Sequence, residues 1–304
     1  MKSPEEIRQA LTGPVASVST PFCEDGGIDY AALRNTVDFV IAAGSKTVLL
    51  TNGDSLFSIL TDEEVAEVTR VVAEHTAGRA LVVTADRVWA TPKEVAFAQY
   101  AREAGADVLM VLCPDWAESC TLETLVEHYA AVANEIPTML VTNWLGARPM
   151  TFSMTFLAAL RDRVPGVVAV KDDLCGEFAR RMSMVVSEHM AVISGGQKQN
   201  HLNNQPYGCD GYLSTFIRFR PQIAHDYWEA VESGNRDDAL RIIRDYDIPL
   251  FDFLHALPGG FDAGIHGALE LCGIAKRWRR KPYYSLDDAE MERLAAFFNA
   301  RGIL

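Results

Sequence analysis

Short apolar runs alternate along the chain with longer segments in which apolar residues recur every three or four positions. A short continuous apolar run is typical of a strand buried on both faces, and the recurring pattern is typical of an amphipathic helix. The predicted strands cover residues 14–20, 47–51, 80–84, 107–112, 138–142, 167–170, 191–194 and 211–214. Helical segments follow them at 29–43, 61–75, 122–134, 153–163 and 177–188, and one more begins at residue 91.

Eight strands with helical segments between them predict an α/β fold, a closed (β/α)8 TIM barrel. An open doubly wound sheet is the alternative, but no G-x-G-x-x-G follows the first strand. Further helical segments lie at 221–233, 237–257, 264–271 and 286–299, which is more helix than a barrel needs. We therefore predict a barrel over residues 1–220 and a C-terminal helical extension over 221–304 that packs on it.

The composition limits the possible partners. A net charge of −13 and a pI near 5.0 argue against a nucleic-acid or anionic-membrane partner. No apolar run approaches the roughly 18 residues of a membrane span. The six cysteines form no C-x-x-C pair, which predicts reduced thiols in a soluble, cytoplasmic protein, and no metal-ligand spacing is present.

The basic run Lys276–Lys281 is short and isolated, so we expect a solvated loop or a subunit contact there.

Candidate chemistry lies where the predicted strands end, because a barrel of this kind carries its active site at the carboxyl ends of its strands. Lys171 follows the sixth strand, and hydroxyl, amide and glycine residues follow the second, fifth and seventh. A desolvated lysine amine attacks a carbonyl carbon to form a Schiff base, while hydroxyl and N–H donors hold a carboxylate. The sequence thus indicates a keto-acid substrate. The alternative is that Lys171 is a solvated residue at a strand edge.

Four of these segments carry a family resemblance. Val18–Phe22, Thr51–Asp54, Val168–Asp172 and Gly208–Ser214 resemble the motifs of the dihydrodipicolinate synthase/N-acetylneuraminate lyase family of class I aldolases. The resemblance covers roughly residues 10–300 and implies a barrel with a C-terminal helical extension. It also implies a Schiff base between a strand-six lysine and pyruvate or another 2-keto acid, no cofactor, and a homo-oligomer, a tetramer or a dimer.

The resemblance assigns roles to several positions and also shows departures. Lys171 would form the imine, and Thr51 and Asn52 would hold the substrate carboxylate in the position of the family's G-T-T-G-E loop. The family's strand-five tyrosine, its proton relay, aligns with Thr142, whose hydroxyl is shorter and does not ionise near neutral pH. We expect proton transfer to fall to Thr142 through water, to a hydroxyl of the substrate, or to an acid that the resemblance does not assign.

The remaining predicted substrate-binding residues are Asn143, Arg148 and Gly195. Arg148 lies one residue beyond the position of a loop arginine that binds the substrate carboxylate in some family members, and Gly195 would allow close approach at the pocket floor.

Other polar residues near the strand ends have two possible readings. Asp172 and Asp173 could relay protons, but one of them is expected to cap the helix that follows. Lys198, after the seventh strand, is expected to be solvated, and Trp116 and Trp144 are expected to narrow the pocket.

These observations predict a Schiff-base lyase, an aldolase or a dehydratase, that acts on pyruvate or a larger 2-keto acid through Lys171. The alternative is a barrel that binds or senses keto acids and has lost turnover together with the strand-five tyrosine.

Overall fold

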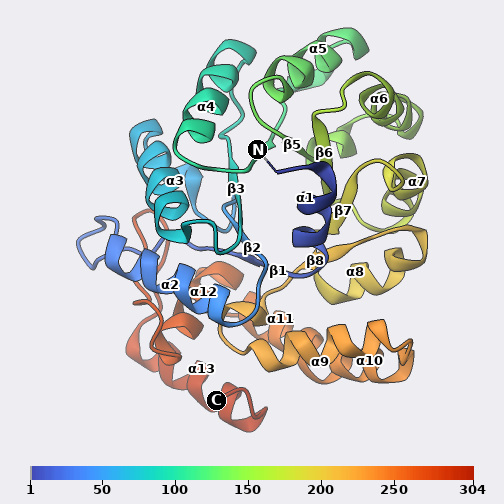
Figure 1. The fold of residues 1–304 in the computed structure, drawn as a ribbon. Coiled ribbons are helices and arrows are strands. Elements are labelled where there is room, and N and C mark those ends of the chain that lie inside the picture. The colour runs from blue at the N-terminus through green and yellow to red at the C-terminus, as the bar shows by residue number, and fades with distance from the viewer. Residues whose placement is uncertain (1) are drawn as a thin grey trace.

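Eight parallel strands close into a barrel in sequence order in the computed structural model, which describes residues 2–304 (Figure 1). The strands are β1 (Gly13–Ser17), β2 (Thr47–Leu49), β3 (Leu81–Ala85), β4 (Val108–Val111), β5 (Thr138–Val141), β6 (Val167–Asp172), β7 (Ala191–Ser194) and β8 (Gly211–Leu213). The predicted TIM barrel is confirmed. Most strands are shorter than predicted, whereas β6 extends two residues further and includes Lys171 and Asp172.

Helices form a ring around the strands (Figure 1). They are α2 (Tyr30–Ala42), α3 (Asp62–Thr76), α4 (Thr91–Glu103), α5 (Leu122–Ala133), α6 (Met150–Arg163), α7 (Gly176–Val186), α8 (Gln197–Asn204) and α9 (Pro221–Glu232). Local sequence fixes several of their first turns. At α3, for example, the Thr61 side chain accepts the Glu64 N–H and the Glu64 carboxylate accepts the Thr61 N–H, so both backbone donors are satisfied.

A helix that the sequence pattern did not predict, α1 (Pro4–Leu11), precedes the first strand and lies within the ring of strands in Figure 1. Ile7 and Leu11 on its inner face are fully buried, and α1 contacts β6 and β7. The helix therefore covers the amino-terminal end of the barrel, opposite the end where the site lies.

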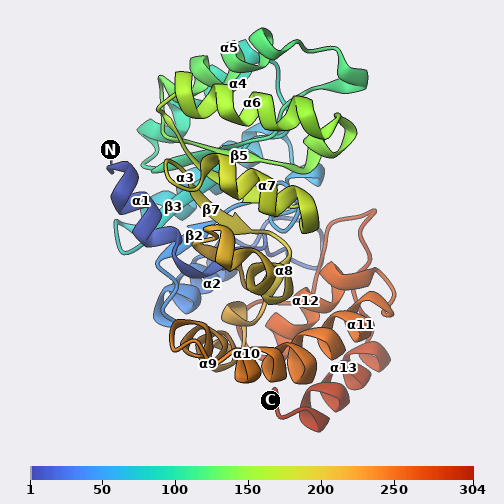
Figure 2. The ribbon, with the colours of Figure 1, turned by 90° about the vertical axis from the view of Figure 1, so that its right-hand side faces the viewer.

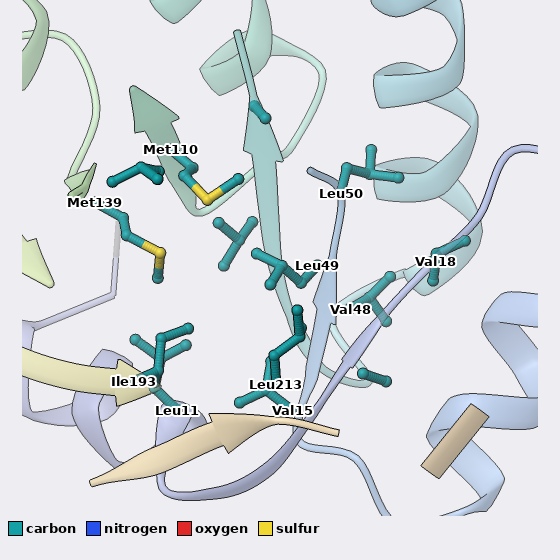
Figure 3. Packing of buried hydrophobic residues seen from close by; sticks show 14 of the residues in the cluster. Leu11, Val15, Val18, Val48, Leu49, Leu50, Met110, Met139, Ile193 and Leu213 are labelled. Atoms are coloured by element: carbon teal, nitrogen blue, oxygen red, sulfur yellow. The ribbon is translucent and has the colours of Figure 1, made fainter. Parts of the chain in front are cut away.

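The barrel interior is filled by apolar side chains from different strands. Leu49, Met110, Met139, Ile193 and Leu213 are all buried and gather in one space in Figure 3. A filled interior means that a substrate cannot pass through the barrel, so it must enter from the carboxyl ends of the strands.

Further helices follow α9: α10 (Arg236–Ile242), α11 (Ile248–His255), α12 (Gly260–Leu271) and α13 (Asp288–Ala300). The single helix predicted over 237–257 is interrupted by a π-helical turn at Ile243–Asp247. Figure 2 shows α11, α12 and α13 on the side of the barrel away from α1, near the carboxyl ends of the strands. Because α9 packs against β1, the division of the chain at residue 220 stays a prediction.

We expected a solvated loop or a subunit contact at the basic run near the C-terminus. Its two lysines are exposed, but its arginines are held within the chain, and the subunit contact stays a prediction. Its arginines reach acids on separate elements: Arg277 pairs with Asp288, Arg279 with Asp262 and Arg280 with Glu64. The loop thereby fastens the C-terminal helices to one another and to α3.

Two acids are buried together behind the strand ends. Asp86, after β3, accepts the Leu112 N–H, whereas neither carboxyl oxygen of Glu94 on α4 has a hydrogen-bond partner among residues 2–304. Burial, with the nearby charge of Asp86, raises the pKa of Glu94 well above its usual range, and burial raises the pKa of Asp86. The folded protein therefore keeps a proton there that the unfolded chain releases, so stability falls as the pH rises above about 4.3, the ordinary pKa of glutamate.

Replacing Glu94 with glutamine is expected to raise the free energy of unfolding at neutral pH and to flatten its fall with pH. The glutamine amide keeps its N–H hydrogens at every pH in this range and can donate one to Asp86. In the parent, each proton that the folded state must keep lowers the free energy of unfolding by up to about 1.4 kcal/mol per pH unit. Urea unfolding of both proteins between about pH 5 and pH 8 measures the difference. Glu103→Gln at the exposed end of α4 is the matched control. Parallel curves for the parent and Glu94→Gln would contradict the account in which the folded protein keeps a proton at Glu94.

Candidate active site

Lys171 lies near the end of β6, between Val141 of β5 and Ile193 of β7. Only 7% of the residue is exposed, and its Nζ donates a hydrogen bond to the Asp173 carboxylate. The alternative of a solvated strand-edge lysine is therefore wrong. Lys171 and Asp173 border a pocket of ≈450 Å³ that β7, α8 and the C-terminal helices complete.

The two aspartates after Lys171 have different tasks. Asp172 is buried, and its carboxylate accepts the N–H groups of Leu174 and Cys175 at 3.2 and 3.1 Å, immediately before α7. Burial raises the pKa of Asp172. Asp173 points instead to the Lys171 amine. One acid thus holds the turn and the other joins the candidate site, a division that sequence adjacency alone does not reveal.

Thr142, the residue in the relay position, contacts both aspartates. Its hydroxyl accepts the Asp173 backbone N–H at 2.9 Å and donates to the Asp172 carboxylate at 3.2 Å. Thr142 is fully buried. Its hydroxyl proton is therefore used to fix the Lys171–Asp173 segment, and its predicted part in proton transfer stays a prediction.

Gly195 is required by the position of Asp173. A Cβ atom at residue 195 would lie 1.8 Å from the Asp173 Oδ1 atom. The Gly195 N–H donates to the Asp172 carbonyl at 2.7 Å, which holds the β7 end against the β6 end. The structure therefore brings Gly195, Lys171 and Thr142 together around Asp173: the first two lie against its carboxylate and Thr142 binds its backbone N–H.

The loop after β2 reaches the pocket through a different residue than expected. The Thr51 hydroxyl accepts the Asp54 N–H at 2.8 Å, and the Asn52 amide donates to the Asp86 carbonyl at 3.4 Å. Asp54 borders the pocket with Lys171, and its carboxylate accepts from Ser17 and lies 3.6 Å from Arg218. Thr51 binds within the loop and Asn52 binds the segment after β3, so their role as carboxylate ligands stays a prediction.

Asn143 and Arg148 are not among the residues that border this pocket. Asn143 is exposed, and its side chain accepts the Trp144 N–H at 2.8 Å. Arg148 forms an ion pair with buried Asp115 at 2.7 Å and donates to the Cys120 carbonyl at 2.6 Å. Their substrate-binding roles stay predictions, and for Arg148 such a role would require the loss of these bonds.

The wall that faces Lys171 comes from the C-terminal helices. Phe251 and His255 of α11 and Phe261 of α12 border the pocket, and the Phe251 and Phe261 rings stack at 5.2 Å and 9°. Sequence analysis missed this wall, although the spacing of four between Phe251 and His255 already places both on one helix face. The expected narrowing by Trp116 is wrong for this chain, because Trp116 is 86% exposed.

Lys198, beside the pocket on α8, is not solvated as we expected. It is fully buried, and its Nζ lies 2.7 Å from an Asp247 oxygen in the π-helical turn. Burial lowers the pKa of Lys198. This pair ties α8 to the C-terminal helices and thereby supports both sides of the pocket.

Residues 2–304 contain no group of three or more His, Cys, Asp or Glu side chains that could hold a metal ion. No helix in the same range is long and apolar enough to cross a membrane.

Comparison with known proteins agrees with the barrel. The sequence model of the Dihydrodipicolinate synthetase family matches residues 10–301. The chain belongs to this family. Enzymes of the dihydrodipicolinate synthetase family are lyases that form a covalent imine between a lysine and the substrate and need no cofactor.

Individual family members are only distantly similar. The 4-hydroxy-tetrahydrodipicolinate synthase of Dechloromonas aromatica is 24% identical over 97% of this chain and 99% of its own. The structure of YagE from E. coli K12, in complex with pyruvate, superposes with a TM-score of 0.81 at 22% identity over 96% of this chain and 99% of that one. The structure of N-acetylneuraminate lyase from Fusobacterium nucleatum superposes with a TM-score of 0.82 at 17% identity, over 96% of this chain and 99% of that one. At this level of identity, the two structures support the fold.

Gly195→Ala is expected to destabilise the protein by about 1–3 kcal/mol, because the added methyl group overlaps the Asp173 carboxylate. In the double variant Gly195→Ala/Asp173→Gly, the overlap is gone and most of the loss should be recovered. Thermal unfolding of the parent, both single variants and the double variant forms the cycle that measures this. Additive losses would contradict the assigned packing of Asp173 on Gly195.

Proposed function

We propose that this protein is a Schiff-base-forming lyase, an aldolase or a dehydratase, that acts on pyruvate or a larger 2-keto acid through Lys171. The observation that carries the proposal is a buried lysine amine at the end of β6, bonded to a carboxylate and open to a ≈450 Å³ pocket. Membership of a family that uses a lysine imine supports the same residue.

The pocket suggests how a keto acid would lie. Its keto carbon would reach the Lys171 amine, and its carboxylate would lie toward the strand ends, where hydroxyl and backbone N–H donors are concentrated. We propose Thr51, Asn52, Asn143, Arg148 and Gly195 for this binding, with Thr142 as a catalytic neighbour of Lys171. Any larger group would extend toward the aromatic wall. The pyruvate complex of the related YagE supports a 2-keto acid as ligand.

The second candidate is a keto-acid binding or sensing barrel without turnover. One observation favours it: the Thr142 hydroxyl at the relay position is bonded to Asp172 and Asp173 and presents no free acid to the pocket. Binding without product would distinguish this candidate from the lyase.

We further propose that the protein is cytoplasmic and forms a homo-oligomer, a tetramer or a dimer. All six cysteines are free thiols, which suits a reducing compartment. Membership of the family, for which the sequence resemblance implies a homo-oligomer, supports this state.

Borohydride reduction in the presence of pyruvate, followed by peptide mass mapping, tests the proposal. We expect the reduced adduct on Lys171. Lys171→Ala should lose it, because Lys171 is the one lysine among residues 2–304 that borders this pocket. Lys276→Ala, in an exposed loop, is the matched control and should be labelled like the parent. If neither pyruvate nor any larger 2-keto acid labels Lys171, the proposal is contradicted. An adduct without product would favour the sensor.

A further inference from the structure

We propose that Asp173 is the acid–base residue of this site and transfers the protons that the family's strand-five tyrosine would otherwise transfer. The inference rests on the proposed imine chemistry of Lys171 and adds a catalytic residue to it. Asp173 touches a reacting atom directly, because its carboxylate accepts a hydrogen bond from the Lys171 Nζ.

Three separate features hold the Asp173 carboxylate at the amine. Its backbone N–H is fixed by the Thr142 hydroxyl at 2.9 Å. The missing side chain of Gly195 leaves the space that Oδ1 occupies, since a Cβ there would lie 1.8 Å away. The Asp172 carboxylate already accepts the N–H groups before α7, so the Asp173 carboxylate is not needed there and can bind the amine. The threonine that replaces the tyrosine thus positions the acid that would act in the tyrosine's place.

Asp173 can also reach a bound substrate. Its side chain is 28% exposed, against 9% for Lys171, and both border the pocket. Within residues 2–304, Asp173 is the one acid that forms an ion pair with Lys171. The other carboxylate at the pocket, Asp54, accepts from Ser17 and lies 3.6 Å from Arg218, so it is held toward the opposite side of the barrel mouth.

The contact supplies each proton needed for imine formation. The Asp173 carboxylate first takes a proton from the Lys171 ammonium, and the neutral amine then attacks the keto carbon. The new C–N bond forms as the carbonyl π pair moves to oxygen, and a proton passes from nitrogen to that oxygen to give the carbinolamine. Asp173 returns its proton to the hydroxyl, the C–O bond breaks, and water leaves as the nitrogen lone pair forms C=N. The sum is ammonium plus ketone giving iminium plus water, with the carboxylate regenerated.

The regenerated carboxylate is then placed for the next step. It takes a proton from C3 of the iminium, the C–H pair forms the C2=C3 bond, and the C=N π pair returns to nitrogen to give the enamine. Enamine formation is the step shared by aldol addition and its reversal, so the same acid would serve either direction.

Exchange of the C3 protons of pyruvate in D2O, followed by proton NMR, tests this role apart from imine formation. Asp173→Asn should lower the exchange rate by about 10²- to 10⁴-fold, the usual contribution of a general acid–base group. Lys171 should still be labelled by pyruvate and borohydride after long incubation. Glu177→Gln, at an exposed residue that pairs with Arg181, is the matched control and should exchange like the parent.

Asp173→Ala with added formate separates catalysis from structure. The shortened side chain leaves room for a small carboxylate at the amine, so exchange should rise with formate concentration by at least about tenfold. A residue that only supports the fold would not be replaced in this way. Thermal unfolding of each variant confirms that a folded protein is compared.

The outcomes distinguish this inference from the function on which it rests. A parent protein with neither an adduct nor C3 exchange overturns both. If the parent is labelled at Lys171 and the C3 exchange rate of Asp173→Asn lies within about threefold of the parent rate, the role of Asp173 is overturned and the Lys171 imine is still supported. The role of Asp173 is also overturned if the C3 exchange rate of Asp173→Ala is low and added formate does not raise it.

Discussion

The hydrogen-bonded pair of Lys171 and Asp173 is the interaction on which the candidate site depends. An ammonium group that is almost fully buried costs several kcal/mol unless an opposite charge compensates it. Asp173 supplies that charge at the end of β6, and its contact with the amine is also the path by which a proton can leave. The same bond therefore stabilises the lysine at rest and, in our proposal, activates it.

The barrel fixes this pair from three strands. The hydroxyl of Thr142 after β5 holds the backbone of Asp173, and Gly195 after β7 leaves space for its carboxylate. The C-terminal helices then close the pocket, because the buried pair of Lys198 and Asp247 ties α8 to the π-helical turn before α11. Residues far apart in the sequence thus position Asp173 and the pocket beside it. Because the barrel interior is filled, a substrate reaches this pocket from the carboxyl ends of the strands.

The periodic pattern was sufficient to predict the barrel and its strands, since these depend on residues close together in the chain. It placed Lys171 at the end of a strand, but the imine role of Lys171 came from the family resemblance and stays a prediction. It did not reveal α1, which is only two turns long and is stabilised mainly by packing under the barrel. Nor could it decide which of Asp172 and Asp173 faces the lysine, because that depends on the strand continuing past Lys171. The burial of Lys198 was missed for a similar reason: its partner lies 49 residues away. Contacts of this kind depend on tertiary structure and leave no local pattern.

A crystal structure of the protein soaked with pyruvate would test the central claim most directly. The account predicts a continuous bond from Lys171 Nζ to the keto carbon, with the Asp173 carboxylate within about 3 Å of the imine nitrogen. Pyruvate bound without a covalent bond, or an imine from which Asp173 has turned away, would contradict it.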